Sequence, residues 1–460
     1  MELTELENWI ARQTVRSTTL MERAISAAQL CRRRHVGKGQ VIRPARGSVL
    51  ASPEIADWNP EPDYFFHWLR DSAIVMRTVA DLMEDAAGEP ERRRWAAHFE
   101  DFVGFSLTLK ACDGRAMLAE RGERIAHGRS DKFLRPDAEL SALTGDALLG
   151  EPRFNPDGTI DVFRWSRPQY DGPALRALAC LRFLAAGGAS SPQLLTLLQG
   201  DLDFTVRYAG HPCIGPWEEP NQNGWHYYVE LAQFAALSRG RTNGAGDDWP
   251  LAEQTLRRDL EQYWSERHRV LMAVRPAAAQ SADDLIDAAT LLAVWDADLP
   301  DGPHSVLDPR VQKTQEAIEA LFARELPINC SHAGAPLLGR SRGDRYFGGG
   351  AWYPTTLAAA GLCYRLARLC PDGRQVNFAR GDAFMTAIMQ FTPADGSLSE
   401  QIDRTTGMQT SARHLTWSYA AFISTARERR LASPLVSQAA GHANSHQSGY
   451  RSLNVSTDHQ

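Results

Sequence analysis

The sequence predicts an all-α fold in which six helical hairpins form a ring. About twelve segments place apolar residues at helical spacing, and convincing strands are few. The connections between these segments alternate between short and long, as a ring of hairpins requires. One domain then accounts for most of the 460 residues. We expect a single catalytic domain over 1–432 and a polar tail over 433–460, where apolar periodicity ends.

The helix candidates follow one another along the whole chain. The first spans Leu3–Cys31, and the second begins after Asp71 and stops before the breaker Gly88-Glu89-Pro90. The fourth has signals at both ends, because Asp171 is a candidate N-cap and Gly187-Gly188 favours termination. By number, the candidates from the third onward lie at 90–110, 171–187, 191–208, 225–238, 251–264, 284–295, 311–323, 352–369, 381–389 and 411–427.

The composition is typical of a soluble globular protein. Charged residues make up 23% and the net charge is −6, so neither disorder nor a basic nucleic-acid-binding surface is indicated. No apolar run of about 18 residues is present, and we expect neither a membrane span nor a secretory leader. The seven cysteines form no C-x-x-C pair, which suits reduced thiols in the cytoplasm. The 13 histidines lack zinc-binding spacing, and we expect no metal and no other cofactor.

The long connections hold most of the glycine, proline, tryptophan and paired charges. Most of their segments combine flat aromatic side chains with carboxylate, guanidinium or amide groups. Five such segments are PDYFFHWLRD (62–71), RWSRPQYDGP (164–173), GPWEEPNQNGW (215–225), GRSRGDRYFGGGAW (339–352) and DGSLSEQ (395–401). An aromatic face stacks on the C–H side of a sugar ring, and the polar groups hydrogen-bond its hydroxyls. These loops therefore predict a carbohydrate ligand.

Hydrolysis of a glycosidic bond needs two carboxyl groups. One protonates the leaving oxygen, and the other activates water or attacks the sugar carbon. Glu218 or Glu219 is a candidate acid, because the adjacent Trp217 excludes water and the neighbouring carboxylate opposes ionisation. Glu400, in a turn with glycine and serine before a helix, is a candidate base. The alternative is that these are ordinary surface carboxylates, as most of the 56 acidic residues are.

Six motifs resemble, in order and spacing, the inverting glucoamylase-type enzymes of glycoside hydrolase family fifteen. They are PDYFFHWLRDSA, WSRPQYDGPALRA, WEEPN, GRSRGDRYFGGGAWY, DGSLSEQ and SARHLTWSYAAF, and they run from Pro62 to Phe422. Members of that family fold as an (α/α)6 barrel of six inner and six outer helices. The resemblance implies this barrel here, in agreement with the helix count.

The resemblance also implies a role for each matching residue. Glu218 matches the general acid and Glu400 the general base. Arg70 and Asp71 match the pair that binds hydroxyls of the terminal glucose. The other matches lie in the sugar-binding subsites: Tyr64 supporting the base, Trp68 and Trp417 in the wall of the innermost subsite, Trp165 near the acid, Glu219 against the leaving sugar, Arg340 beside the cleaved bond, and Tyr346 and Trp352 at corresponding aromatic positions.

The twelve tryptophans divide into two groups by position. Trp68, Trp165, Trp217, Trp352 and Trp417 lie beside polar clusters and are predicted sugar platforms, with core anchoring as the alternative. The tryptophans in or beside helical patterns are assigned to packing: Trp9, Trp95, Trp249, Trp264 and Trp295.

Departures from the commonest fungal pattern concentrate on the leaving-group side. Pro216 and Pro220 flank Trp-Glu-Glu where fungal members usually carry leucine and valine, and His67 and Tyr170 also differ. These changes leave the linkage and chain length of the substrate open. They do not alter the two carboxylates that the reaction class needs.

The sequence therefore predicts an inverting, exo-acting α-glucosidase that releases β-glucose from the non-reducing ends of α-1,4- or α-1,6-linked gluco-oligosaccharides. Inversion implies that the carboxyl groups of Glu218 and Glu400 lie about 6.5–9.5 Å apart. One alternative is a trehalase or another disaccharide hydrolase on the same scaffold. Another is a non-catalytic, carbohydrate-binding regulatory subunit.

Overall fold

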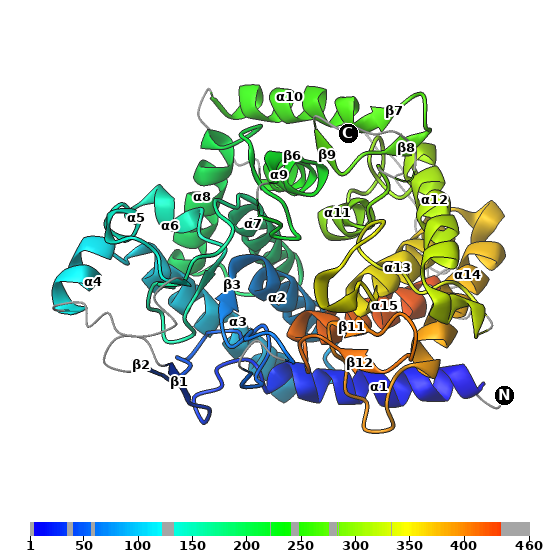
Figure 1. Cartoon of the computed structure of the whole chain (residues 1–460), viewed down its shortest axis with the longest axis horizontal. Helices are drawn as coiled ribbons and strands as arrows, with labels where there is room; N and C mark the ends of the chain where they lie inside the picture. The colour runs from blue at the N-terminus through cyan, green and yellow to red at the C-terminus, as the bar shows by residue number, and fades with distance from the viewer. Residues whose placement is uncertain are drawn as a thin grey trace, which may run out of the picture.

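Twelve helices in the described part of the chain alternate between an outer and an inner position (Figure 1). The computed structural model describes residues 4–34, 40–56, 60–121, 133–220, 222–240, 248–275, 283, 285–332 and 334–433. The inner helices are α2 (Leu69–Glu84), α7 (Asp171–Ala185), α9 (Tyr227–Gly240), α11 (Ala289–Ala297), α13 (Tyr353–Leu369) and α15 (Thr416–Ala432). The outer helices are α1 (Glu5–Glu22), α3 (Glu89–Lys110), α8 (Pro192–Arg207), α10 (Asp248–Leu260), α12 (Pro309–Glu325) and α14 (Arg374–Gln390).

The inner helices form a closed ring. Each contacts the next along the chain, from α2 through α7, α9, α11 and α13 to α15, and α15 contacts α2. Each outer helix packs on an inner neighbour, as α3 does on α2 and α14 on α13. In Figure 1, α10 lies along the top and α1 along the bottom, with the inner helices between them. This arrangement is an (α/α)6 barrel and confirms the predicted fold class.

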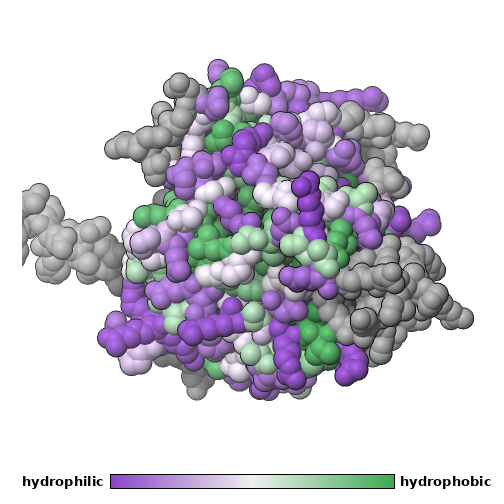
Figure 2. Space-filling view, turned by 90° about the vertical axis from the view of Figure 1, so that its left-hand side faces the viewer, coloured by the Kyte–Doolittle hydropathy of each residue, from purple (hydrophilic) through white to green (hydrophobic). Residues whose placement is uncertain are grey.

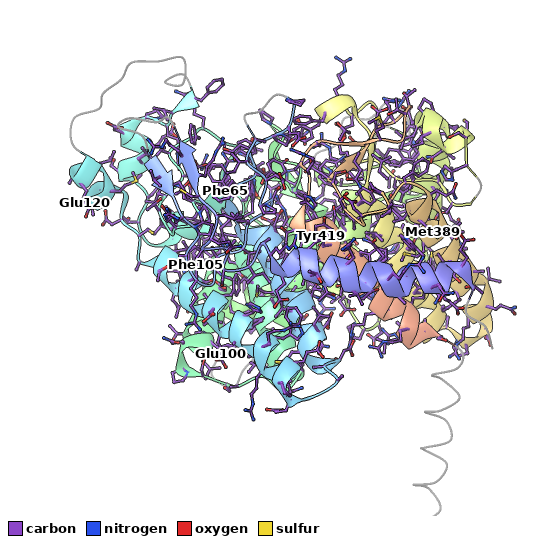
Figure 3. The ribbon with its side chains drawn as sticks, turned by 90° about the horizontal axis from the view of Figure 1, so that it is seen from below. Phe65, Glu100, Phe105, Glu120, Met389 and Tyr419 are labelled. Carbon is purple, nitrogen blue, oxygen red and sulfur yellow. The ribbon has the colours of Figure 1, made fainter. Side chains whose placement is uncertain are left out.

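Burial differs between the two rings as their positions require. On the inner helix α13, every residue from Tyr353 to Ala367 is buried, whereas α10 buries residues along one face only. In Figure 3, the outer helix α1 lies across Tyr419 of α15, and Met389 marks the neighbouring helix α14. The core therefore occupies the ring of inner helices and its contacts with the outer ring.

The first helix is shorter than the predicted Leu3–Cys31. It ends at Glu22, and Ser26 then adopts the left-handed region with φ of 52°. Alanines of the following turn pack in a small separate core with Phe65. A non-glycine residue in that region interrupts a right-handed helix. The prediction was wrong here because the turn is itself apolar and continues the helical spacing.

Helix α14 begins at Arg374, seven residues before the predicted start at Gly381. Gly381 lies within the helix because it allows a close approach to Tyr364. A Cβ at this position would lie 2.5 Å from an atom of the Tyr364 ring. The glycine was therefore wrongly interpreted as a boundary signal.

The predicted connection 111–170 contains three short helices that the sequence did not reveal. They are α4 (Gly114–Arg121), α5 (Asp137–Ser141) and α6 (Asp146–Leu149). Helices of this length show too few turns for a clear apolar period.

Short paired strands connect the loops at the N-terminal ends of several inner helices. β3 leads directly into α2, β6 into α9 and β10 into α13. β3 pairs with β4, β5 with β6, and β11 lies between β10 and β12. The strands are β1 (Arg32–Arg34), β2 (Gln40–Ile42), β3 (His67–Trp68), β4 (Arg153–Phe154), β5 (Cys213–Ile214), β6 (Asn223–His226), β7 (Trp264–Ser265), β8 (Val270–Leu271), β9 (Val274–Arg275), β10 (Ala351–Trp352), β11 (Gln401–Ile402) and β12 (Gln409–Thr410).

The surface mixes hydrophilic side chains with dispersed apolar ones. Figure 2 shows hydrophilic residues over much of one face, with apolar residues among them in a middle band. The large exposed apolar side chains of the described residues are Val15, Val41, Ile55, Phe133, Leu195, Leu251, Val376 and Met408. None of the described helices has the length and apolar character needed to cross a membrane. Residues 434–460, nearly all of the predicted tail, lie outside the described residues.

Candidate active site

A cavity of about 650 Å³ lies at the N-terminal ends of the inner helices. Every residue predicted to bind substrate or to catalyse the reaction lines it: Tyr64, Trp68, Arg70, Asp71, Trp165, Trp217, Glu218, Glu219, Arg340, Tyr346, Trp352, Glu400 and Trp417. The fold thus brings segments from six separate connections and helix starts to one place. The roles of these residues stay predictions.

The backbone of Glu218 is held in a conformation that few non-glycine residues adopt. Glu218 lies in the turn between β5 and β6, with φ of 59°. Its N–H donates to the Gly215 carbonyl at 3.1 Å, and its own carbonyl accepts from Ser166 Oγ at 2.6 Å. A left-handed non-glycine residue costs roughly 1–3 kcal/mol, so the surrounding contacts must offset that strain.

The Glu218 carboxyl group accepts hydrogen bonds from four N–H donors. Its Oε1 accepts from Trp68 Nε1 at 2.9 Å, Arg70 Nη2 at 2.9 Å and Gln169 Nε2 at 3.0 Å. Its Oε2 accepts from Trp165 Nε1. These four donors hold both oxygens of the carboxyl group in place. The side chain is 11% exposed, unlike a hydrated loop carboxylate.

Arg70 contacts three carboxylates on this side of the cavity. It binds Glu218, contacts Asp171 at 2.8 Å and approaches Asp71 at 3.7 Å. The expected N-cap role of Asp171 is wrong, because Tyr170 occupies the cap and Asp171 begins α7 with its carboxylate on Arg70. Burial, together with the charges of Glu218 and Asp171, raises the pKa of Asp71 to about 7. Arg70 and Asp71 are both buried, which excludes an exposed salt bridge.

Glu400 lies on another wall of the cavity, directly before β11. Its N–H donates to the Ala412 carbonyl at 2.8 Å, and the carboxylate accepts from Ser411 Oγ. Glu400 is only 3% exposed. The sequence placed Glu400 before a helix, but the following residues form a strand paired with β10 and β12. That pairing fixes Glu400 beside Trp352.

Burial dominates the electrostatics of Glu400. It raises the pKa of Glu400 to about 7, and the charge of Asp71 acts in the same direction. Hydrogen bonds from Ser411 and Tyr64 and the charge of Arg340 lower the pKa and only partly offset this effect. Near neutral pH in the unliganded cavity, the balance of these effects favours the protonated form of Glu400.

Arg340 organises the opposite rim of the cavity. It contacts Asp344 at 2.5 Å and Glu219 at 3.0 Å, and Glu219 is the more exposed of these carboxylates. Its guanidinium group also lies over three aromatic rings, those of Tyr346 at 4.9 Å, Trp352 at 5.4 Å and Trp217 at 5.5 Å. This cation keeps an aromatic wall and a carboxylate in fixed relation.

Trp217 is oriented by a residue that the sequence did not indicate as part of the site. Its Nε1 donates to both carboxylate oxygens of Asp287, at 2.8 and 3.0 Å. Asp287 also accepts from the Ala289 N–H at the start of α11, at 2.7 Å. Burial raises the pKa of Asp287 to about 6. The sequence did offer one signal, since Asp287 is an acidic residue just before a helix. That signal was missed because the predicted helix began at 284, three residues before Asp287.

Other residues contact the two candidate carboxyl groups or line the cavity, and they received no predicted role. Ser166 and Gln169 lie within the quoted motif around Trp165, yet their contacts with Glu218 depend on the fold. Ser411 likewise supports Glu400 from a separate loop. Additional lining residues are Arg164, Ser166, Arg167, Ile214, Pro216 and Pro220.

Core packing does not separate the two groups of tryptophans. Trp95, Trp249 and Trp295 lie in the main core, and Trp9 and Trp264 pack against it. The five predicted platforms line the cavity, but Trp417 also belongs to the main core and Trp68 to a smaller one. Their role as sugar platforms stays a prediction. Among the described residues, no group of three or more His, Cys, Asp or Glu side chains is arranged to hold a metal ion.

Comparisons with known proteins identify the family of this chain. Residues 28–108, 137–376 and 375–427 match the model of the family described as Glycosyl hydrolases family 15. Glucoamylase-1 of Schizophyllum commune is 28% identical over 449 residues, which cover 86% of this chain and 71% of that protein. The intracellular sporulation-specific glucoamylase of Saccharomyces cerevisiae is 26% identical, with 82% of this chain and 77% of that protein covered.

Solved structures show the same fold. The glucoamylase of Hormoconis resinae matches with a TM-score of 0.72 and 23% identity, over 93% of this chain and 74% of that chain. The glucoamylase of Saccharomycopsis fibuligera matches with a TM-score of 0.71 and 23% identity, over 93% of this chain and 96% of that chain. The family match covers most of the sequence, and the chain therefore belongs to glycosyl hydrolase family 15.

Proposed function

We propose that this protein is an inverting, exo-acting α-glucosidase of the glucoamylase type. Its substrates are α-linked gluco-oligosaccharides, from whose non-reducing ends it releases β-glucose. The observation that carries this proposal is that Glu218 and Glu400 line one cavity with sugar-type aromatic and polar residues. The names of the glucoamylase relatives support the same substrate class.

Each carboxyl group has one task in the proposed reaction. Glu218 donates a proton to the glycosidic oxygen as the bond from that oxygen to the anomeric carbon breaks. Glu400 accepts a proton from a water that attacks the anomeric carbon from the opposite face. This geometry needs about 6.5–9.5 Å between the two carboxyl groups, and it inverts the anomeric configuration.

The active form has its proton on Glu218 and a carboxylate on Glu400, although burial raises the pKa of Glu400 to about 7 in the unliganded cavity. An entering sugar supplies hydroxyls that compete for Arg70, which otherwise donates to Glu218 Oε1. Loss of one donor weakens the carboxylate form of Glu218, and the glycosidic oxygen offers an acceptor for the proton. Substrate binding thereby favours the active protonation state.

The distribution of the platforms supports exo action. Trp68, Trp352 and Trp417 are buried, whereas Trp165 and Trp217 are only partly buried. A terminal glucose fits between the buried rings, and the next sugar units lie toward the exposed ones. The enzyme therefore removes one unit at a time from the chain end.

The test compares Glu218→Gln and Glu400→Gln with the wild-type protein on maltotriose. We expect each substitution to lower kcat by several orders of magnitude with a modest change in KM, because each group acts mainly in the transition state. Glu89→Gln is the matched control, since Glu89 is an exposed residue on α3. Near-wild-type turnover by either variant would remove that residue from the mechanism. Proton NMR of the first product should show β-glucose.

A disaccharide substrate is the second candidate, and one observation favours it. Pro216 and Pro220 both line the cavity beside Glu218 and Glu219, on the side of the leaving sugar. Rigid residues there alter the shape that the leaving group meets. Initial rates on maltose, isomaltose, trehalose and maltotriose distinguish these substrates. Binding of glucosides without hydrolysis of any of them would instead support a regulatory subunit.

We also propose a reducing compartment, such as the cytoplasm. All seven cysteines are free, and Cys31 and Cys330 are exposed. Exposed thiols persist where cellular reductants maintain them. Fractionation of the source cells with immunodetection tests this location, and recovery from the external medium would contradict it.

A further inference from the structure

Arg153 lies behind two of the indoles that line the cavity. It is on β4, and the pairing of β4 with β3 sets Arg153 opposite Trp68. The residue is 2% exposed. The carbon of its guanidinium group lies 3.8 Å from the ring centroid of Trp165, 4.8 Å from that of Trp68 and 4.0 Å from that of Phe66. These are cation–π distances in a site from which water is excluded.

Arg153 belongs to a buried network of arginines and carboxylates. Its Nε donates to Asp161 at 2.9 Å, and Arg167 bridges Asp161 at 3.2 Å to Glu151 at 2.7 Å. Arg135 donates to Glu151 at 2.9 Å, and the exposed Glu139 approaches it at 3.6 Å. Among the described residues, Nη1 of Arg153 has no hydrogen-bond partner.

The two indoles in front of Arg153 are the ones that bind Glu218. Trp68 donates its N–H to Oε1 and Trp165 donates its N–H to Oε2, so each carboxylate oxygen has one indole donor. A cation on the face of an indole draws on its π electrons and strengthens the N–H as a donor. Stronger donors favour the ionised form of the acceptor.

We propose that Arg153 is a positioning residue that sets the orientation and protonation of Glu218 through the indoles of Trp68 and Trp165. It touches the rings and the buried network. This inference rests on the proposed acid role of Glu218.

Other charged and titratable groups reach Glu218 from the cavity side. Arg70 binds it directly, and the groups that share the cavity or the Arg70 cluster are Tyr64, Asp71, Arg164, Arg167, Asp171, Glu219, Arg340, Tyr346 and Glu400. Arg153 differs in acting from behind the rings. Its contribution can therefore be removed while every cavity-facing group stays in place.

The pH dependence of kcat/KM tests this role, because kcat/KM reports the free enzyme. In the proposed mechanism the general acid must be protonated and the general base ionised, so the alkaline limb reports ionisation of the acid, Glu218, and the acid limb reports protonation of the base, Glu400. Arg153→Met keeps the aliphatic stem and removes the charge. We expect the alkaline limb to move to higher pH by roughly half a unit to one unit, with the acid limb unchanged.

Two further variants separate charge from packing. Arg153→Lys retains a cation and should restore the wild-type alkaline limb. Arg135→Met is the matched control, because it also removes one arginine from the network and leaves Glu151 paired with Arg167. We expect it to lower the thermal unfolding temperature as Arg153→Met does, without moving the alkaline limb. Arg153→Gln serves as the neutral variant if the methionine variant does not fold.

The outcomes are distinct. An unmoved alkaline limb in a folded, neutral variant would overturn the proposal. An equal shift in Arg135→Met would also overturn it, because the effect would then come from the network as a whole rather than from the rings. Failure of the proposed function is a separate result, since the wild-type protein would then hydrolyse none of the gluco-oligosaccharides.

Discussion

The hydroxyl groups of Tyr64 and Tyr346 lie 2.6 Å apart, although the two residues come from opposite halves of the chain. Tyr64 also hydrogen-bonds to Glu400. Because Tyr64 has one proton to donate, its bond to Glu400 leaves Tyr346 as the donor to Tyr64. A chain of two phenols thus directs one hydrogen bond at the candidate base.

Tyr346→Phe tests this chain. The substitution removes the donor to Tyr64 and leaves the ring over which the Arg340 guanidinium lies. We expect kcat on maltotriose to fall about tenfold with little change in KM, as loss of one hydrogen bond in a network predicts. Phe347→Leu, in the neighbouring residue, is the control. Unchanged kcat in Tyr346→Phe would show that Tyr64 supports Glu400 without help.

The pKa of Glu400 predicts the acid limit of activity. Burial raises this pKa to about 7, and a general base must be ionised to accept a proton from water. We therefore expect kcat/KM to decline as the pH falls below about 7, measured by initial rates from pH 4 to 9. Full kcat/KM at pH 4 would contradict this result.

The same raised pKa predicts a gain in stability when Glu400 is made neutral. The folded protein binds the proton of Glu400 more tightly than the unfolded chain, so stability falls as pH rises from about 4.5 to about 7. Glu400→Gln removes this loss and should raise the free energy of unfolding at pH 7.5 on the order of 1–3 kcal/mol. The gain should vanish near pH 4. Urea unfolding at both pH values checks this, and an equal effect at both would contradict it.

Asp287→Ala should weaken substrate binding through Trp217. The substitution leaves the indole N–H without its acceptor and removes the bond to the Ala289 N–H at the start of α11. We expect KM to rise several-fold and the free energy of unfolding to fall by about 1–3 kcal/mol. Asp287→Asn keeps an acceptor and should restore much of both. Equal effects of alanine and asparagine would contradict this account.

Gly350→Ala tests the strand contact that carries Glu400 and Trp352. A Cβ at Gly350 would lie 2.2 Å from the carbonyl oxygen of Ile402 on β11, so β10 and β11 must separate. We expect a large loss of both thermal stability and kcat. Gly104→Ala is the control, because open space surrounds that position on α3 and alanine there should stabilise the helix by roughly 0.5–1 kcal/mol. Wild-type activity of Gly350→Ala would contradict the strand constraint.

The sequence by itself determined the all-α class, the approximate helix positions and the residues that line the cavity. Apolar spacing is a local property, so it indicates which face of a helix will be buried. The motifs around Glu218 and Glu400 are equally local, because each combines its carboxylate with aromatic and polar neighbours in a few residues. The sequence could not indicate two-residue strands such as β10 and β11, since so short a segment has no period.

Only the tertiary structure decided which partners these residues meet. In the sequence Asp171 is a candidate helix cap, but in the structure it binds Arg70. Asp287 binds Trp217, from which it is distant in the sequence. Arg153 becomes relevant to Glu218 only when β4 pairs with β3. The physical reason is that closure of the helical ring brings distant loops together. Burial and hydrogen bonding in the resulting cavity, rather than neighbours in the chain, then determine the pKa of Glu400.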